Sequence, residues 1–285
     1  MTPLFIAEVS SNHQQSLERC FEFVDVSAQV GCDAVKFQLF KIDELFAPEI
    51  LSQSEEHSRR RKWELSPEWI PAIAARCREK RIQFGCTPFY LNAVDELAPH
   101  VDFLKVASYE LLWDDLLSRC AKSNKPVILS TGMATMAEVE KAVATLTQNS
   151  CTDLTLLQCV SAYPTPLAAC NLSVINTFRK KFNVKAGWSD HTVQPTVLYR
   201  AAFGFHSDVI EFHLDLEGDG AEYEAGHCWL PHEIAIVIRT IREGLMADGN
   251  GVKNPVDAEL PDRDWRADPV DGLRPLKHIR EGWTP

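Results

Sequence analysis

Two segments decide the fold of this chain: Val184-Lys-Ala-Gly-Trp-Ser-Asp-His191 and Asp208-Val-Ile-Glu-Phe-His213. Each has the composition of a buried β-strand and each ends on a histidine. If the two strands are parallel neighbours, the side chains at their carboxyl ends converge on one face of the sheet. Two imidazoles there can hold a divalent ion and leave coordination positions open for a substrate. We therefore predict a parallel sheet with His191 and His213 as metal ligands.

The same kind of segment recurs along the chain and predicts eight strands. They are Leu4–Val9, Ala34–Gln38, Gln83–Thr87, Phe103–Ala107, Pro126–Ser130, Leu154–Cys159, Val184–Trp188 and Val209–Phe212. Between them lie segments with apolar residues at helical spacing, such as Ser16–Val30, Pro67–Lys80, Met136–Thr147 and Thr192–Phe203. Alternation of this kind predicts an α/β fold, a (β/α)8 TIM barrel over residues 1–247, with its functional face at the strand carboxyl ends.

Two segments fall outside the alternation. The connection from Leu39 to Leu65 is too long for a simple loop and carries the charged run Glu55–Lys62. We interpret it as a solvated surface excursion in preference to a substrate lid. Residues 248–285 are rich in Gly, Pro and charge, and we expect a tail that packs on the barrel without forming a second domain.

Composition limits the class of protein. Of the 285 residues, 45% are hydrophobic and 24% charged, as in a soluble globular protein, and no run approaches the roughly 18 apolar residues of a membrane span. The amino terminus has no signal-peptide pattern, so we expect a cytoplasmic protein. The net charge of −11 argues against nucleic acid or an anionic membrane as partner. Nine cysteines without a C-x-x-C pair indicate reduced thiols.

Polar residues gather where the predicted strands end. Lys36 and Lys105 come from different strands and are accompanied by hydroxyl groups, a combination that favours binding of a phosphate-bearing anion. Glu8 and Glu211 lie at equivalent depth and either complete a metal shell, transfer protons or neutralise the lysines. The full set is Glu8, Lys36, Gln38, Thr87, Lys105, Ser108, Ser130, Ser161, Tyr163, Ser189, His191, Glu211 and His213.

At this point the sequence resembles the sialic acid synthase (N-acetylneuraminate synthase) family. The motifs that carry the resemblance occur in family order across almost the whole predicted barrel. They are Ile6-Ala-Glu-Val-Ser-Ser-Asn-His13, Val35-Lys-Phe-Gln38, Cys86-Thr-Pro-Phe89, Lys105-Val-Ala-Ser-Tyr-Glu110, Leu129-Ser-Thr-Gly-Met-Ala134, Gln158-Cys-Val-Ser-Ala-Tyr-Pro-Thr-Pro166, Gly187-Trp-Ser-Asp-His-Thr192 and Val209-Ile-Glu-Phe-His213.

The resemblance implies an enzyme that condenses phosphoenolpyruvate with a sugar aldehyde, makes a 3-deoxy-2-ketonic sugar acid and releases phosphate. It implies catalytic roles for Glu8 and Glu211 and a Mn²⁺ or Mg²⁺ ion on His191 and His213. The implied phosphoenolpyruvate site comprises Lys36, Thr87, Lys105, Ser108, Ser130 and Ser189. The implied sugar site comprises Asn12, Gln38, Ser161, Tyr163 and Glu224.

The sequence departs from the family pattern mainly on the sugar side. Phe212 stands where a basic residue is usual, Leu214 where an aromatic residue is usual, and Ser161 where Asn is common. Glu224 stands at the place of an Asp that contacts the sugar. We also expect no antifreeze-like domain after the barrel, and this weakens the homodimer that the resemblance implies.

Three interpretations therefore stay open. The first is synthesis of a nonulosonic, sialic-acid-like acid from an N-acetylmannosamine-like or related hexosamine. The second keeps phosphoenolpyruvate and the metal but uses a different, shorter or phosphorylated sugar. The third is an inert sugar-binding or scaffold barrel, against which the retained lysines and histidines argue.

Overall fold

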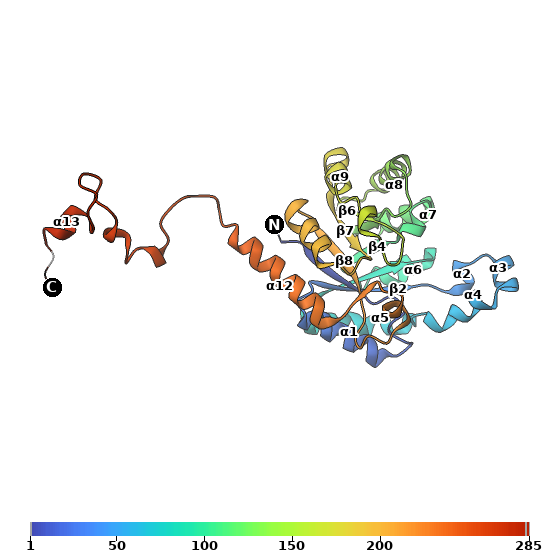
Figure 1. Cartoon of the computed structure of the whole chain (residues 1–285). Coiled ribbons are helices and arrows are strands. Elements are labelled where there is room, and N and C mark those ends of the chain that lie inside the picture. Colours follow the sequence, from blue (N-terminus) through green and yellow to red (C-terminus); the bar gives the residue numbers. More distant parts are fainter. Residues whose placement is uncertain (1, 283, 285) are drawn as a thin grey trace. The chain divides into compact units, whose positions relative to one another are not determined.

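A computed structural model of the chain describes residues 2–282 and 284 and divides them between two compact units, Met1–Leu245 and Met246–Pro285 (Figure 1). The first unit contains a closed parallel sheet, which confirms the predicted TIM barrel. Strands β1 to β8 pair in sequence order, and β8 returns to pair with β1. They are Leu4–Glu8, Ala34–Leu39, Gln83–Pro88, Phe103–Val106, Val127–Ser130, Leu154–Cys159, Lys185–Asp190 and Val209–Leu214.

Helices join the strands and cover the barrel. Those that follow the strands are α1 (Leu17–Gln29), α5 (Ile70–Lys80), α6 (Leu91–Leu97), α7 (Asp114–Lys122), α8 (Met136–Gln148), α9 (Val174–Phe182), α10 (Pro195–Tyr199) and α12 (Pro231–Ala247). Ser16 caps α1 by accepting the backbone N–H of Arg19, as serine does at a helix start. None of the described helices has the length and apolar character needed to cross a bilayer.

A ninth strand was not predicted from the sequence. The two-residue strand β9 (Cys228–Trp229) pairs in parallel with the end of β8, so that His213 lies beside Cys228. The short helix α11 (Ala221–Glu224) lies in the connection between them. This pairing brings the segment after β8 back to the carboxyl end of the barrel.

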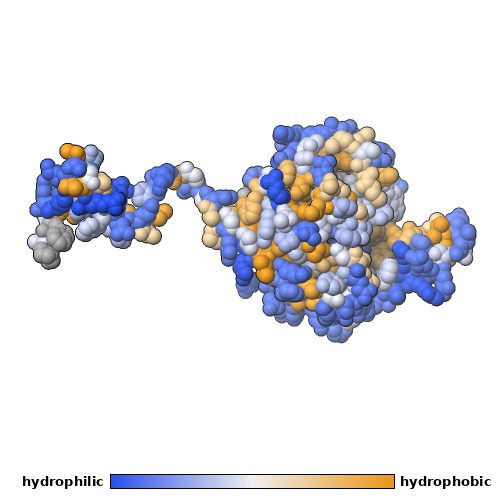
Figure 2. All heavy atoms as spheres, viewed as in Figure 1, coloured by the Kyte–Doolittle hydropathy of each residue, from blue (hydrophilic) through white to orange (hydrophobic). Residues whose placement is uncertain are grey.

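The long connection after β2 forms short helices: α2 (Ile42–Leu45), α3 (Pro48–Gln53) and α4 (Glu55–Arg59). Figure 1 shows them grouped together beside the barrel, away from its strands. Most of their residues are exposed, and in Figure 2 the excursion carries hydrophobic residues among hydrophilic ones. In the second unit the structure has only one short α-helix, α13 (Lys277–Arg280), among the residues described. That this unit packs on the barrel stays a prediction.

Side chains alternate along each strand between the helices and the barrel interior, as the period of two requires. Phe5 and Ala7 belong to the large core between strands and helices, whereas Ile6 belongs to a separate cluster inside the barrel. The interior cluster comprises Ile6, Ala34, Phe103, Ile128, Leu157 and Val209. These residues fill the barrel, so any inward side chain two positions later points to the carboxyl-end face.

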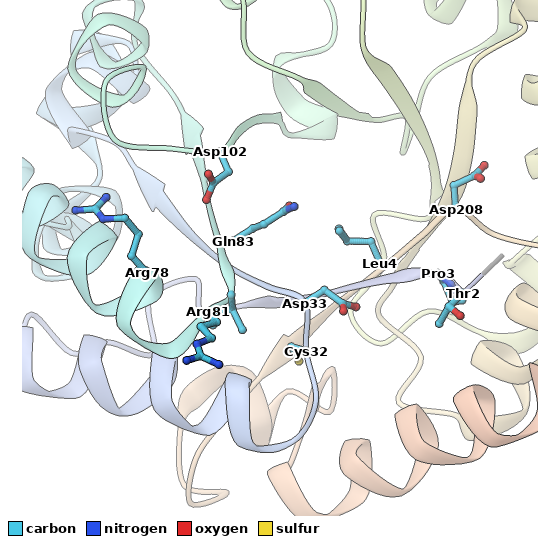
Figure 3. Close-up of a pocket in the computed structure, with 11 residues that line it drawn as sticks. Thr2, Pro3, Leu4, Cys32, Asp33, Arg78, Arg81, Gln83, Asp102 and Asp208 are labelled. Atoms are coloured by element: carbon cyan, nitrogen blue, oxygen red, sulfur yellow. The ribbon is translucent and has the colours of Figure 1, made fainter. Parts of the chain in front are cut away.

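A pocket of about 660 Å³ lies at the opposite, amino end of the strands (Figure 3). Three of its acidic residues serve the fold. Asp33, Asp102 and Asp208 each precede an even-numbered strand and accept the backbone N–H of Phe5, Phe84 and Ala186, respectively, at 2.8–2.9 Å. Because these carboxylates are occupied in joining neighbouring strands, and because the amino face of such barrels serves stability, we assign this pocket no catalytic role.

Candidate active site

The inward side chain changes from apolar to polar over two residues on most of the strands. Ile6 is followed by Glu8, Ala34 by Lys36, and Phe103 by Lys105. The same step leads from Ile128 to Ser130, from Val209 to Glu211 and from Gly187 to Ser189. Glu8, Lys36, Thr87, Lys105, Ser130, Ser189 and Glu211 are all no more than 5% exposed. The barrel therefore carries a ring of buried polar groups next to the interior cluster, on its carboxyl-end side.

The two lysines share this ring with two carboxylates. Glu8 pairs with Lys36, while Glu211 lies 3.5 Å from the Lys105 ammonium and 3.9 Å from the Lys36 ammonium. Burial acts to raise the pKa of Glu211, but the charges of Lys105 and Lys36 outweigh it and lower the pKa to about 2. Burial lowers the pKa of Lys36 to about 8. Glu211 is therefore a fixed negative charge between two cations at neutral pH.

Hydroxyl groups complete this half of the site. Lys36 donates to Thr87 Oγ1 at 3.1 Å, and Lys105 donates to Ser130 Oγ at 2.7 Å. Ser189 donates to Glu211 at 2.9 Å. The structure thus joins five of the six residues expected for the phosphoenolpyruvate site into one network with Glu8 and Glu211.

The sixth residue, Ser108, follows β4, and its hydroxyl lies near Gly132 together with that of Ser161, which follows β6. Ser108 Oγ accepts the backbone N–H of Gly132 at 2.9 Å, and the hydroxyl of Ser161 is buried without a hydrogen-bond partner among the described residues. A Cβ atom on Gly132 would lie 2.3 Å from Ser161 Oγ and 2.9 Å from Ser108 Oγ. Glycine is required there because a Cβ atom would clash with both hydroxyl oxygens.

The predicted metal ligands lie together, with their ring centres 5.3 Å apart. His191 Nδ1 lies 2.9 Å from the Val160 carbonyl oxygen, which fixes a proton on Nδ1, and His213 Nδ1 lies 2.8 Å from Glu222 Oε2. In both rings Nε2 is then the nitrogen with a free lone pair. Metal-binding histidines usually have their other nitrogen held in this way, so the pair fits a divalent ion.

His191 is positioned by Asp190, which is fully buried. One carboxylate oxygen of Asp190 accepts the Trp188 indole N–H at 2.9 Å and the Thr192 hydroxyl at 2.7 Å. The other accepts the Trp229 indole N–H at 3.1 Å. A single side chain therefore fixes the turn that carries His191 and ties β9 to it.

The remaining residues expected at the sugar site are placed differently from one another. Gln38 donates to Glu8 Oε1 at 3.2 Å, and the half-exposed Tyr163 ring has its centre 4.3 Å from that of His191. Asn12 is buried and donates to the Leu214 carbonyl at 3.0 Å, so it holds the segment that follows β8. Glu224 is exposed, and its side chain makes none of the described hydrogen bonds or ion pairs.

Glu222 and His227 were not predicted from the sequence, and both lie at the site. Glu222 Oε1 accepts the Ser10 hydroxyl at 2.5 Å, and its other oxygen faces His213. Burial opposes ionisation, but the neighbouring imidazoles of His213 and His227 outweigh it and hold the pKa of Glu222 well below its usual range. The ring centres of His227 and His213 are 5.1 Å apart. The available signal was a third histidine 14 residues after His213.

Buried lysines, carboxylates and imidazoles at the carboxyl ends of a closed parallel barrel define a class: (β/α)8 proteins with a site in the position where such barrels carry out catalysis. Residues 23–253 match the NeuB family, and the chain belongs to that family. This confirms the resemblance to sialic acid synthases inferred from the motifs.

Relatives and solved structures agree with this membership. The chain is 33% identical over 286 residues to an N,N'-diacetyllegionaminic acid synthase of Legionella pneumophila, covering 92% of this chain and 78% of that protein. It is 36% identical over 262 residues to an uncharacterized protein of Methanocaldococcus jannaschii, and the match covers 90% of this chain and 75% of that protein. A crystal structure of N-acetylneuraminic acid (sialic acid) synthetase from Leptospira borgpetersenii, in complex with citrate, aligns with a TM-score of 0.80 at 28% identity, covering 92% and 90%.

Proposed function

We propose that this protein condenses phosphoenolpyruvate with the open-chain aldehyde of an N-acetylmannosamine-like or related hexosamine, forming a nonulosonic acid and phosphate. The observation that carries the proposal is the buried pair Lys36 and Lys105, which meet the same carboxylate, Glu211, beside the imidazoles of His191 and His213. The names of the relatives support it, since they include synthases of legionaminic and pseudaminic acids.

In the proposed reaction, C3 of phosphoenolpyruvate attacks the aldehyde carbon, water adds to C2, and the bond from C2 to the phosphate oxygen breaks. Lys36 and Lys105 bind the phosphate and carboxylate of phosphoenolpyruvate, with hydroxyls of Thr87, Ser130 and Ser189 orienting them and Ser108 adding a further donor. Binding requires no new buried charge from the protein, because the ammonium groups are already in place.

The two carboxylates have different tasks in this proposal. Glu211, held anionic by its lysines, stabilises the positive charge that develops at C2. Glu8, which accepts the Ser10 backbone N–H at 2.7 Å, is oriented to take a proton from the attacking water.

His191 and His213 would hold a divalent ion, Mn²⁺ or Mg²⁺. When bound, the ion would polarise the aldehyde oxygen and stabilise the negative charge that forms on it. Gln38, Ser161 and Tyr163 are assigned to the sugar, and Asn12 supports the segment after β8. Glu222 takes the acidic position that we expected for Glu224, because Glu222 is the carboxylate turned toward the site.

The test is phosphate release from phosphoenolpyruvate, measured with Mn²⁺ and with Mg²⁺ across N-acylated hexosamines, shorter aldoses and aldose phosphates. Release that requires an N-acylated hexosamine supports the proposal, whereas release only with shorter or phosphorylated aldoses supports the second enzyme interpretation. If none of the sugars in the panel supports phosphate release, the interpretation as an inert barrel is favoured. The His191→Ala and His213→Ala variants should lose turnover while keeping their fold, because both residues lie at the barrel rim.

The predicted homodimer is tested separately. Sedimentation of the full chain at several concentrations gives its mass, and a monomer at the highest concentration used in the assay would contradict the dimer.

A further inference from the structure

His227 is a buried imidazole without a hydrogen bond. Its side chain is 8% exposed, and Nδ1 has no partner among the described residues. Its Nε2 lies 3.6 Å from Glu222 Oε2, beyond hydrogen-bond distance. A buried polar group left unpaired costs about 1–3 kcal/mol. Such a group needs an explanation, and an absent ion is one of the common ones.

Three histidine rings face one another at this place. The ring centres of His191 and His213 are 5.3 Å apart, those of His213 and His227 are 5.1 Å apart, and those of His191 and His227 are 6.5 Å apart. With a nitrogen-to-metal distance of about 2.1 Å, two imidazole rings on one ion have centres about 4.5–5.5 Å apart. The distances from His213 to His191 and to His227 already lie in this range. The distance between His191 and His227 is about 1 Å too long, and it reaches the range if one of these two rings moves toward the other by that amount.

Glu222 lies behind two of these rings. One oxygen, Oε2, is 2.8 Å from His213 Nδ1 and 3.6 Å from His227 Nε2, while Oε1 is anchored by the Ser10 hydroxyl. A carboxylate that accepts the Nδ1–H of a histidine leaves Nε2 unprotonated and turned to the metal. Glu222 is therefore placed to set the tautomer of His213.

We propose that the metal centre of this protein has three imidazole ligands, His191, His213 and His227, with Glu222 as the positioning residue of His213. The inference rests on the proposed function only in placing a divalent ion between His191 and His213. Imidazole ligands suit Zn²⁺, Co²⁺ and other transition metals, whereas Mg²⁺ takes oxygen ligands. A third imidazole therefore favours a transition metal over Mg²⁺ at this site.

The first experiment uses the unaltered full chain with ¹⁵N-labelled histidine. Zn²⁺ added to metal-free protein should shift the side-chain nitrogen resonances of three histidines, and the assigned set should include His227. Shifts confined to His191 and His213 would overturn the proposal.

The second experiment measures Co²⁺ and Mg²⁺ dissociation constants by calorimetry, together with the visible spectrum of the bound Co²⁺. His227→Gln and Glu222→Gln should each weaken Co²⁺ binding about 10–100-fold, and His227→Gln should also change the spectrum, with Mg²⁺ binding much less affected. His232→Gln and Glu224→Gln are the matched controls, because both residues are exposed, and they should bind Co²⁺ as the wild type does.

Failure of this proposal differs from failure of the proposed function. If His227→Gln retains the wild-type Co²⁺ affinity and spectrum, the third ligand is refuted even where phosphate release is normal. If the side-chain nitrogen resonances of three histidines shift with Zn²⁺ but no sugar supports phosphate release, the three-histidine metal centre is supported and the proposed reaction is refuted.

Discussion

Glu211 is the charge that holds the two buried lysines in place, and replacing it with glutamine should destabilise the protein in a pH-dependent way. Glu211 is 5% exposed, lies 3.5 Å from Lys105 and 3.9 Å from Lys36, and accepts a hydrogen bond from Ser189. The Glu211→Gln variant keeps the size of the side chain and removes only its charge. The two buried ammonium groups then lose the carboxylate that they share, and Glu8 remains paired with Lys36.

The shift of the Glu211 pKa gives the size of the expected loss in the free energy of unfolding. Folding lowers this pKa from 4.5 to about 2. Since each pKa unit corresponds to about 1.4 kcal/mol, the carboxylate contributes about 3 kcal/mol to the free energy of unfolding at pH 7. Breaking a buried ion pair usually costs about 3–5 kcal/mol, which agrees. The contribution is fully present above pH 4.5 and is lost as the pH falls from 4.5 toward 2.

The assay is thermal unfolding and urea unfolding of wild type and Glu211→Gln between pH 7 and pH 3. A loss of about 3 kcal/mol corresponds to a melting temperature about 6–12 °C lower for a domain of this size. The matched control is Glu217→Gln, since Glu217 pairs with Arg19 at 2.6 Å but is 49% exposed, so its loss should cost less than about 1 kcal/mol. A Glu211→Gln deficit that stays constant from pH 7 to pH 3 would refute the reasoning.

Three further predictions concern the parts of the site around this charge. Lys105→Ala should raise the KM for phosphoenolpyruvate about 10–100-fold in the phosphate-release assay, because a charge-assisted contact is lost, and an unchanged KM would count against its role. Gly132→Ala should raise the KM for the sugar, since its Cβ must displace the Ser161 hydroxyl, and the KM for phosphoenolpyruvate, since it must also displace the Ser108 hydroxyl. Unchanged KM values would show that neither hydroxyl binds its substrate. Asp190→Asn should lower the free energy of unfolding by about 2–4 kcal/mol in urea, because an amide has one acceptor oxygen where two carboxylate oxygens now accept bonds, including that from Trp229; a stability equal to wild type would contradict this.

The barrel could be predicted from the sequence because its signal is local and repeated. Each predicted strand lies within two residues of the observed bounds at either end; Val209–Leu214, for example, extends the prediction by two residues. The polar ring could be predicted as well. Inward positions recur every two residues along each strand, and the polar residues at these positions follow the apolar residues of the interior cluster. Lys36, Lys105 and Glu211 were therefore placed correctly at one end of the barrel.

The segment after β8 could not be predicted in the same way, because its position depends on contacts distant in sequence. Strand β9 has only two residues, too few for any alternation, and it exists because it pairs with the end of β8 and because the Trp229 indole reaches Asp190. Asn12, from the first strand's loop, holds the same segment through the Leu214 carbonyl. Neither contact leaves a periodic trace in the sequence.

The proposed replacement of Glu224 by Glu222 at the sugar site follows from the same geometry. Both residues belong to the single turn α11, and two positions along an α-helix turn the side chain by about 200°, so the two carboxylates point in nearly opposite directions. Position relative to His213 therefore identifies an acidic residue in this turn but not which one faces inward. The pairing of His213 with Cys228 decides it, because it fixes where the connection returns to the barrel and leaves Glu222 against the imidazoles and Glu224 exposed. A chemically similar residue two positions away in the sequence is, at this site, on the other side of the helix.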